Sequence, residues 1–237
     1  MLEIRNLTKI YKDSNNGIEN ISLTVEDGDI FGFIGQNGAG KTTTIKAVVG
    51  IHDFDSGEIR INGMSVKEHP VECKQITAYI PDNPDLYEYL SGIDYLNFIG
   101  DMFCVEGNVR TERISKYAEA FGITKSLGDP ITSYSHGMKQ KLAIISALIH
   151  APKFMVMDEP FVGLDPKAAY ILKELMHDLA REGGAIFFST HVLDVAEKLC
   201  DKVAIIKQGK LIEAGTMEEV KGNSSLEEVF LELTDEK

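Results

Sequence analysis

The chain has 237 residues, enough to bury a hydrophobic core in one domain or in a domain with an attached lobe. Its 43% hydrophobic and 26% charged residues are typical of an ordinary soluble globular protein. A formal net charge of −13 and the lack of a Lys/Arg run argue against a general grip on nucleic-acid phosphates, so no nucleic-acid partner is expected.

The cysteines argue against a disulfide-bonded or cysteine-based metal protein, and the apolar runs argue against a chain that spans a membrane. The three cysteines are scattered without metal-ligand spacing, which favours reduced structural thiols in a cytosolic protein. The N-terminus has no signal-peptide layout, and the longest apolar run, residues 142–151, is too short to span a bilayer. Any role at a membrane would therefore be exerted through a partner.

The first third of the chain alternates as short strands do. Residues 2–8 and 21–26 are expected to be strands separated by a polar turn at 12–17. With the apolar run at 29–34 they predict a small antiparallel β region that leads into a glycine-rich loop.

That loop matches the G-x-x-x-x-G-K-[ST] pattern at every fixed position and lies between an expected strand and an expected helix. Its glycines let the backbone aim N–H groups at phosphate, and the helix N-terminus adds free donors and a positive dipole end. An ordinary glycine-rich turn is the alternative, but the context favours binding of a nucleoside triphosphate. The expected contacts are Gly35, Gln36, Asn37, Gly38, Ala39, Gly40, Lys41, Thr42 and Thr43.

The middle and C-terminal parts alternate strands with helices. Helical spacing from residue 90 to about 127 predicts a helical insertion, and a further helix is expected at 137–150. The remaining expected strands are 57–63, 75–80, 153–157, 185–189, 202–207 and 210–214. The remaining expected helices are 167–182, 192–199 and 225–233. The alternation predicts an α/β fold with a parallel sheet.

Two acids follow the continuous apolar run at 153–157. Phosphoryl transfer needs a carboxylate near Mg²⁺ and a group that orients the attacking water. Asp158 suits the first role and Glu159 the second. A strand that ends in a solvated acid pair is the alternative, which the upstream phosphate loop disfavours.

The segment at 133–140 places a small polar residue and a glycine at the start of a helix. Ser135 alone is best read as an N-cap, although the same helix end is suited to bind an anion.

Taken together, these segments resemble the ATP-binding subunit of an ABC transporter. The phosphate loop, Tyr134-Ser135-His136-Gly137-Met138, Met157-Asp158-Glu159, Gly163-Leu164-Asp165-Pro166 and Ser189-Thr190-His191 fall in the family's order, and the likeness covers the whole chain. It implies a P-loop NTPase core with a parallel sheet, an antiparallel β subdomain and an inserted α-helical subdomain. In these terms the single cassette spans 1–237, with the core at about 1–89 and 140–237 and the helical subdomain at about 90–139.

The resemblance also implies roles for single residues. Tyr11 would stack on adenine, and His191 would contact the γ-phosphate beside the catalytic residues Glu159 and Lys41; alone, a Tyr here would be a core or surface residue and a His here a polar cap. Mg²⁺ would be held by Thr42 and Asp158, with Asp82 as a further candidate. Asp165 would lie at a subunit contact.

Partners and location are implied in the same way. Ser135 and Gly137 would close over ATP bound by a second copy or a paired ATPase subunit. Integral membrane subunits would be driven through the helical lobe, which places the protein at the cytoplasmic, inner face of the cell membrane.

Two segments depart from the family pattern, one at Asp82 and one around Ser135. Asp82 stands where the family usually has Gln, and Tyr134, His136 and Met138 replace the usual Leu, Gly and Gln. We expect intact ATP binding with altered turnover.

Junction and tail patterns resemble the drug-, peptide- or ion-exporting subfamily, in which the ATPase is a separate chain. A soluble ABC-type ATPase in assembly, such as iron–sulfur cluster delivery, would share every catalytic residue. A nucleic-acid-linked ATPase is disfavoured by the single cassette and the acidic balance, and a simple P-loop kinase would leave the Ser135 segment and His191 unexplained.

Overall fold

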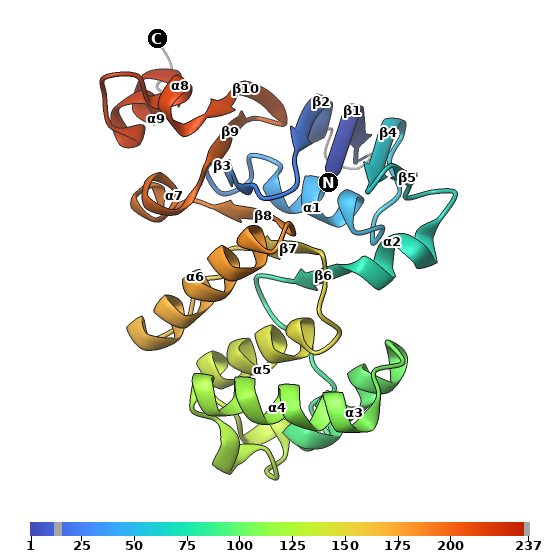
Figure 1. Cartoon of the computed structure of the whole chain (residues 1–237). Helices are drawn as coiled ribbons and strands as arrows, with labels where there is room; N and C mark the ends of the chain where they lie inside the picture. The colour runs from blue at the N-terminus through green and yellow to red at the C-terminus, as the bar shows by residue number, and fades with distance from the viewer. Residues whose placement is uncertain (12–15, 235–237) are drawn as a thin grey trace.

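A six-stranded sheet draws strands from both halves of the chain, in the order β10-β9-β3-β8-β7-β6 (Figure 1). The structure is a computed structural model that describes residues 1–11 and 16–234. The strands are β3 (Ile30–Ile34), β6 (Thr77–Ile80), β7 (Phe154–Asp158), β8 (Ala185–Thr190), β9 (Lys202–Lys207) and β10 (Lys210–Thr216). The neighbours run parallel, except that β10 is antiparallel to β9. The predicted parallel α/β sheet is therefore confirmed.

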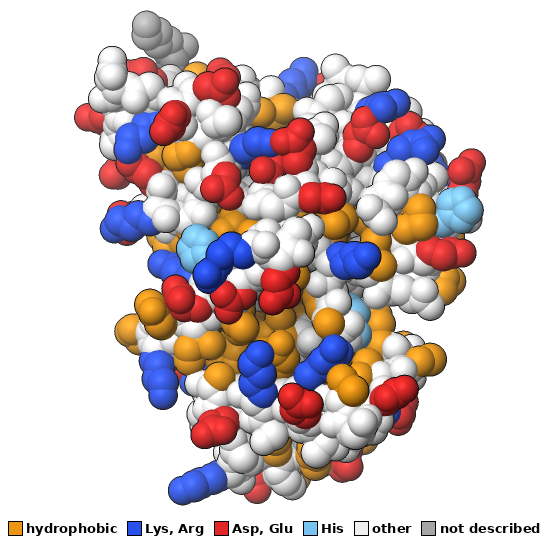
Figure 2. Space-filling view, viewed as in Figure 1, with side chains coloured by type: hydrophobic (Ala, Val, Ile, Leu, Met, Phe, Trp, Pro, Cys, Tyr) orange, Lys and Arg blue, Asp and Glu red, His pale blue; other side chains and the backbone are white. Residues whose placement is uncertain are grey.

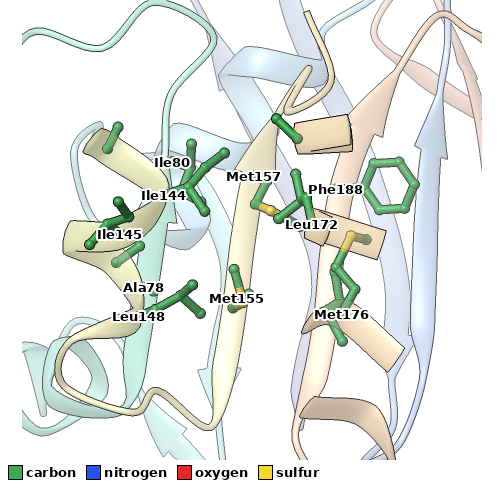
Figure 3. Close-up of a cluster of buried hydrophobic side chains, with 14 of the residues drawn as sticks. Ala78, Ile80, Ile144, Ile145, Leu148, Met155, Met157, Leu172, Met176 and Phe188 are labelled. Carbon is green, nitrogen blue, oxygen red and sulfur yellow. The ribbon is translucent and has the colours of Figure 1, made fainter. Parts of the chain in front are cut away.

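Both faces of the sheet are buried at its central strands β3, β8 and β7, as their apolar sequences require. On β7, Met155 and Met157 face a cluster that includes side chains of α5 and α6, whereas Phe154 and Val156 face the opposite cluster. Figure 3 shows the two methionines between the α5 side chains and the α6 side chains. Helices α5 (His136–Leu148), α6 (Pro166–Arg181), α7 (Leu193–Leu199) and α9 (Leu226–Thr234) cover this first face.

The second face packs on α1 (Lys41–Val48) and on an antiparallel sheet of order β2-β1-β4-β5. Its strands are β1 (Leu2–Ile10), β2 (Gly17–Val25), β4 (Ser56–Ile61) and β5 (Met64–Ser65). Asn62 and Gly63 join β4 to β5, and both have positive φ, the geometry that the Asn-Gly hairpin signal predicts.

The helical lobe consists of α3 (Gly92–Met102), α4 (Gly107–Phe121) and the short 3₁₀ turns at Thr124–Ser126 and Ile131–Ser133, and α5 joins it to the core. Figure 1 places it beyond β6, on the far side of the sheet from β1 and β2. Among the described residues, no helix has the length and apolarity needed to cross a membrane.

Two expectations from the sequence are wrong in part. The pattern groups the strand at 29–34 with the antiparallel region, but β3 lies inside the large sheet, parallel to β8 and β9, because its side chains are buried on both faces. The segment 75–80 is not one strand: α2 (Pro70–Ile76) runs into it and only β6 is extended. Pro70 starts α2 at a first-turn position, where its missing N–H costs nothing.

The sequence pattern also predicts a polar turn near the N-terminus, and it predicts no helix between the last strand and the tail helix. The turn expected at 12–17 falls mostly on residues outside the described ranges. The short helix α8 (Met217–Lys221) has no counterpart among the expected elements, although Thr216 and Glu219 form a capping box at its start.

Candidate functional site

The loop between β3 and α1 has the backbone that phosphate binding needs. Gly38 and Gly40 have φ values of +82° and +112°, which a residue with a side chain rarely adopts. A Cβ at Gly40 would lie 2.6 Å from Ile18 Cγ2, so this position requires glycine for its positive φ and also for lack of space. Since Gly40 also lacks a capping side chain, the first N–H groups of α1 stay available to an anion.

Lys41 is the buried cation of this loop. Its side chain is 5% exposed, and Nζ donates to the carbonyl oxygens of Gly35 at 2.6 Å and Gln36 at 3.3 Å. The same Nζ lies 3.3 Å from Glu159 Oε1. Lys41 therefore links the phosphate loop to the acid that follows β7.

Asp158 and Glu159 lie at the carboxyl end of β7, next to that of β8. Thr42 Oγ1 donates to Asp158 Oδ2 at 2.6 Å, which joins the start of α1 to the first acid. Ser189 donates its hydroxyl proton to Asp158 and accepts the Glu159 N–H at 3.1 Å. The Ser189 hydroxyl thus fixes both acids, a role that the sequence alone does not assign although Ser189 belongs to the motif around His191.

His191 reaches Glu159 from the end of β8. Its Nδ1 is 2.9 Å from Glu159 Oε1, and its backbone N–H donates to Oε2 at 3.3 Å. Glu159 has a φ of +47°, which is uncommon for a residue with a side chain and typical of strain held at functional sites. Lys41, Glu159 and His191 are thereby brought into contact from three different elements.

A cavity of about 220 Å³ opens at this cluster. Its lining contains Tyr11, Asn16, Gly17, Gln36, Asn37, Gly38, Gly40, Lys41, Thr42, Thr43, Asp82, Asp158 and Glu159. Gly35 and Ala39, in the same loop, are buried and do not line this cavity. Most of the sequence-predicted site residues therefore meet in one place.

Asp82 adds a third carboxylate to this cavity. Partial burial raises its pKa, and the negative charges of Asp158 and Glu159 raise it further, against the opposing influence of His136 and His191. The position that departs from the family pattern thus faces the two acids after β7.

Ser135, Gly137 and Asp165 lie outside this cavity. Ser135 is exposed and caps α5 by accepting the Met138 N–H at 3.3 Å. Asp165 caps α6 through Ala168 at 2.9 Å and pairs with Lys141 at 2.5 Å. The Ser135 helix end is left open to a second molecule.

Gly137 and Gly163 hold the Ser135 helix end against the loop that follows Glu159. A Cβ at Gly137 would lie 2.8 Å from the Gly163 carbonyl oxygen, and a Cβ at Gly163 would lie 2.6 Å from His136 Cδ2. This close approach connects the Ser135 helix end to the loop after Asp158 and Glu159 within one chain.

A second hollow, of about 580 Å³, lies between the core and the helical lobe. Figure 2 shows hydrophobic side chains around the indentation between the two parts on its right-hand edge. Within it, His150 stacks on Phe103 with ring centroids 3.8 Å apart, and burial lowers the pKa of His150 to about 4. Burial also raises the pKa of Tyr79 to about 12. Both side chains are therefore uncharged at neutral pH.

Known ATP-binding proteins resemble this chain in sequence and in structure. Residues 18–162 match the ABC transporter family. The chain is 34% identical to the ABC-type transporter ATP-binding protein EcsA of Bacillus subtilis, with 100% of this chain and 97% of EcsA covered. It is also 34% identical to the linearmycin resistance ATP-binding protein LnrL of Bacillus subtilis, with 91% of this chain and 69% of LnrL covered. A solved ATP-binding subunit of an ABC transporter superposes with a TM-score of 0.94 at 33% identity, covering 99% of this chain and 100% of that one.

Proposed function

The chain belongs to the ABC transporter ATP-binding family, and from this membership we propose that two copies share each ATP site and drive transport through a membrane partner. It is an ATP-binding and ATP-hydrolysing subunit of an ABC transporter. What supports the shared site is one observation: the catalytic cluster is assembled in one chain, whereas the Ser135 helix end is exposed and outside the cavity. An exposed helix N-terminus opposite a phosphate loop is suited to hold the far side of a triphosphate.

Within one chain, the position of each residue in or beside the cavity indicates its role in binding or hydrolysis. We propose that Tyr11 stacks on adenine and that the loop N–H groups and Lys41 bind the phosphates. Glu159 orients the attacking water and accepts its proton, while His191 holds Glu159 and contacts the γ-phosphate. When ATP draws Lys41 toward its phosphates, Glu159 loses that cation and becomes free to act as base.

The donor set fits Mg²⁺. The Thr42 hydroxyl and the Asp158 carboxylate lie 2.6 Å apart and are hard oxygen ligands, and Asp82 faces the same cavity. No group of three or more His, Cys, Asp or Glu side chains within residues 1–11 and 16–234 is arranged to hold a metal alone. The phosphates of ATP would complete the coordination, and the ion would neutralise charge on them.

The hollow between core and lobe is the proposed docking place for the membrane subunit. Thr77 Oγ1 and the Tyr79 hydroxyl line it and have no hydrogen-bond partner within the described part of the chain. Its rim continues into the aromatic side chains of Tyr87 and Phe98, whose ring centroids are 5.5 Å apart. Both hydroxyl oxygens are themselves buried, so an amphipathic segment of the membrane subunit would cover the apolar wall around them.

We propose an export subunit with its membrane subunits on separate chains, held at the inner face of the membrane. The resistance role in the name of the relative LnrL favours this over soluble assembly work. Asp165 is proposed to lie at the contact between the two copies, next to the Ser135 helix end.

Mixing two inactive variants tests the shared site. Lys41→Ala removes the phosphate cation and Ser135→Arg blocks the helix end, so each variant alone is expected to have almost no ATPase activity. Mixed dimers contain one site in which both halves are intact, so mixing equal amounts restores about a quarter of the wild-type sites under random pairing. Steady-state phosphate release measures this, and no recovery on mixing would contradict the shared site.

Replacing Asp82 tests whether its charge limits turnover. A carboxylate beside Asp158 and Glu159 disfavours the negative charge that develops at the γ-phosphate end of the site during hydrolysis, so Asp82→Gln is expected to raise kcat by about two- to tenfold while ATP binding is kept. Asp82→Asn separates charge from length, because it removes the charge only. Equal rates in Asp82→Gln and wild type would contradict this role.

A further inference from the structure

The ring of Tyr11 is held from several sides before any nucleotide arrives. The rings of His52 and Tyr11 form a T-shaped pair, with ring centroids 6.2 Å apart and an interplanar angle of 83°. The Tyr11 hydroxyl lies 3.5 Å from Thr43 Oγ1, and Lys9 Nζ lies 5.9 Å from the ring centroid. A ring fixed in this way is a prepared stacking surface for a flat base.

Two of these contacts come from the two ends of one helix. Thr43 lies in the first turn of α1, whose N-terminus is the proposed phosphate site, and His52 follows its last turn. The backbone N–H of His52 donates to the Lys46 carbonyl at 3.1 Å, which ties His52 to α1. The position of the Tyr11 ring relative to the phosphate loop is therefore set by α1.

The loop that carries His52 is also tied to the end of β1, just before Tyr11. Asp55 accepts the Ile10 N–H at 2.7 Å and its own N–H donates to the Thr8 carbonyl at 2.9 Å. This loop leads from α1 to β4, and in Figure 1 α1 lies next to β1 and β4. Tyr11 and His52 are thus held on a common frame.

We propose that His52 is a positioning residue that fixes Tyr11 for the base of a purine nucleoside triphosphate. This inference rests on the proposed stacking of the base on Tyr11. The perpendicular contact with the imidazole restricts rotation of the phenol ring, so binding of the base costs less conformational entropy. His52 acts on the base alone, since it contacts none of the phosphate-binding residues described above.

The test compares a ligand with a base and a ligand without one. In His52→Ala, the KM for ATP is expected to rise by about two- to tenfold, the amount expected for loss of an aromatic pair, with a smaller change in kcat. The dissociation constant of inorganic tripolyphosphate, measured by calorimetry, stays within about twofold. His52→Phe keeps an aromatic ring and is expected to restore the wild-type KM.

Two further variants are needed: Tyr11→Ala tests the stacking itself, and Asp53→Asn is the control for the loop. Asp53 is exposed in the same loop, so Asp53→Asn is the matched control and should keep the wild-type KM. The inference is overturned if His52→Ala keeps the wild-type KM while Tyr11→Ala raises it, or if tripolyphosphate weakens as much as ATP. If Tyr11→Ala also leaves the KM unchanged, the proposed stacking fails and the role of His52 fails with it.

Discussion

Glu159→Gln should bind ATP with near wild-type affinity, lose hydrolysis by at least about 100-fold and accumulate as an ATP-bound dimer. The factor is the usual contribution of a general base. Glutamine keeps the shape of the side chain and its contact distance to His191 but cannot accept the proton of the attacking water. Because hydrolysis is what separates the two copies in the proposed cycle, the closed state should persist.

Three readouts separate this result from misfolding. Phosphate release measures hydrolysis, calorimetry measures ATP affinity, and size-exclusion chromatography with and without ATP measures dimerisation. Glu182→Gln is the matched control, since Glu182 is an exposed glutamate far from the cavity, at the end of α6, and should behave as wild type. Hydrolysis by Glu159→Gln at the wild-type rate would show that another group is the base.

The strands and helices with a strong local pattern are predictable from the sequence. The continuous apolar run before Asp158 favours a strand buried on both faces, and β7 is one. Strand β3 has the same two-sided burial, but its sequence neighbours are antiparallel strands, and pairing is a matter of tertiary contact that local pattern does not contain. The helix α2 escapes prediction for a related reason, because it ends directly against β6 without a turn residue.

The candidate site also contains residues that the sequence pattern predicts and contacts that it does not. The phosphate loop has a fixed spacing, so its residues can be found by pattern alone. The contacts of Glu159 with Lys41 and His191 depend on the parallel order β3-β8-β7, which brings the end of β3 next to the ends of β8 and β7, more than 100 residues later in the chain. Neither the Ser189 hydroxyl nor the His52 ring has a sequence pattern that indicates its role. Both roles follow only from interatomic distances in the structure.

Lys41→Ala should weaken ATP binding by about 100-fold or more and abolish measurable hydrolysis. Lys41 is expected to give charge-assisted hydrogen bonds to the terminal phosphates, each of which is typically worth about 1.5–3 kcal/mol. The matched control is Lys46→Ala, a lysine on the same helix that lies outside the cavity lining. Calorimetric titration with ATP measures the loss, and a dissociation constant within about threefold of wild type would contradict the role of Lys41.

The same substitution also tests the contact between Lys41 and Glu159 without nucleotide. Both side chains are almost fully buried, so removing the ammonium leaves the Glu159 carboxylate with His191 as its remaining partner, and unfolding should cost about 1–3 kcal/mol less. If that loss reflects the uncompensated charge, Lys41→Ala combined with Glu159→Gln should recover most of it in a double-mutant cycle measured by denaturant unfolding. ATP affinity should stay low in the double variant, because the introduced glutamine relieves the buried charge but replaces no phosphate contact. Recovery of stability without recovery of binding would thus separate the two roles of Lys41, whereas strictly additive losses would show that the ion pair contributes nothing to the folded state before ATP binds.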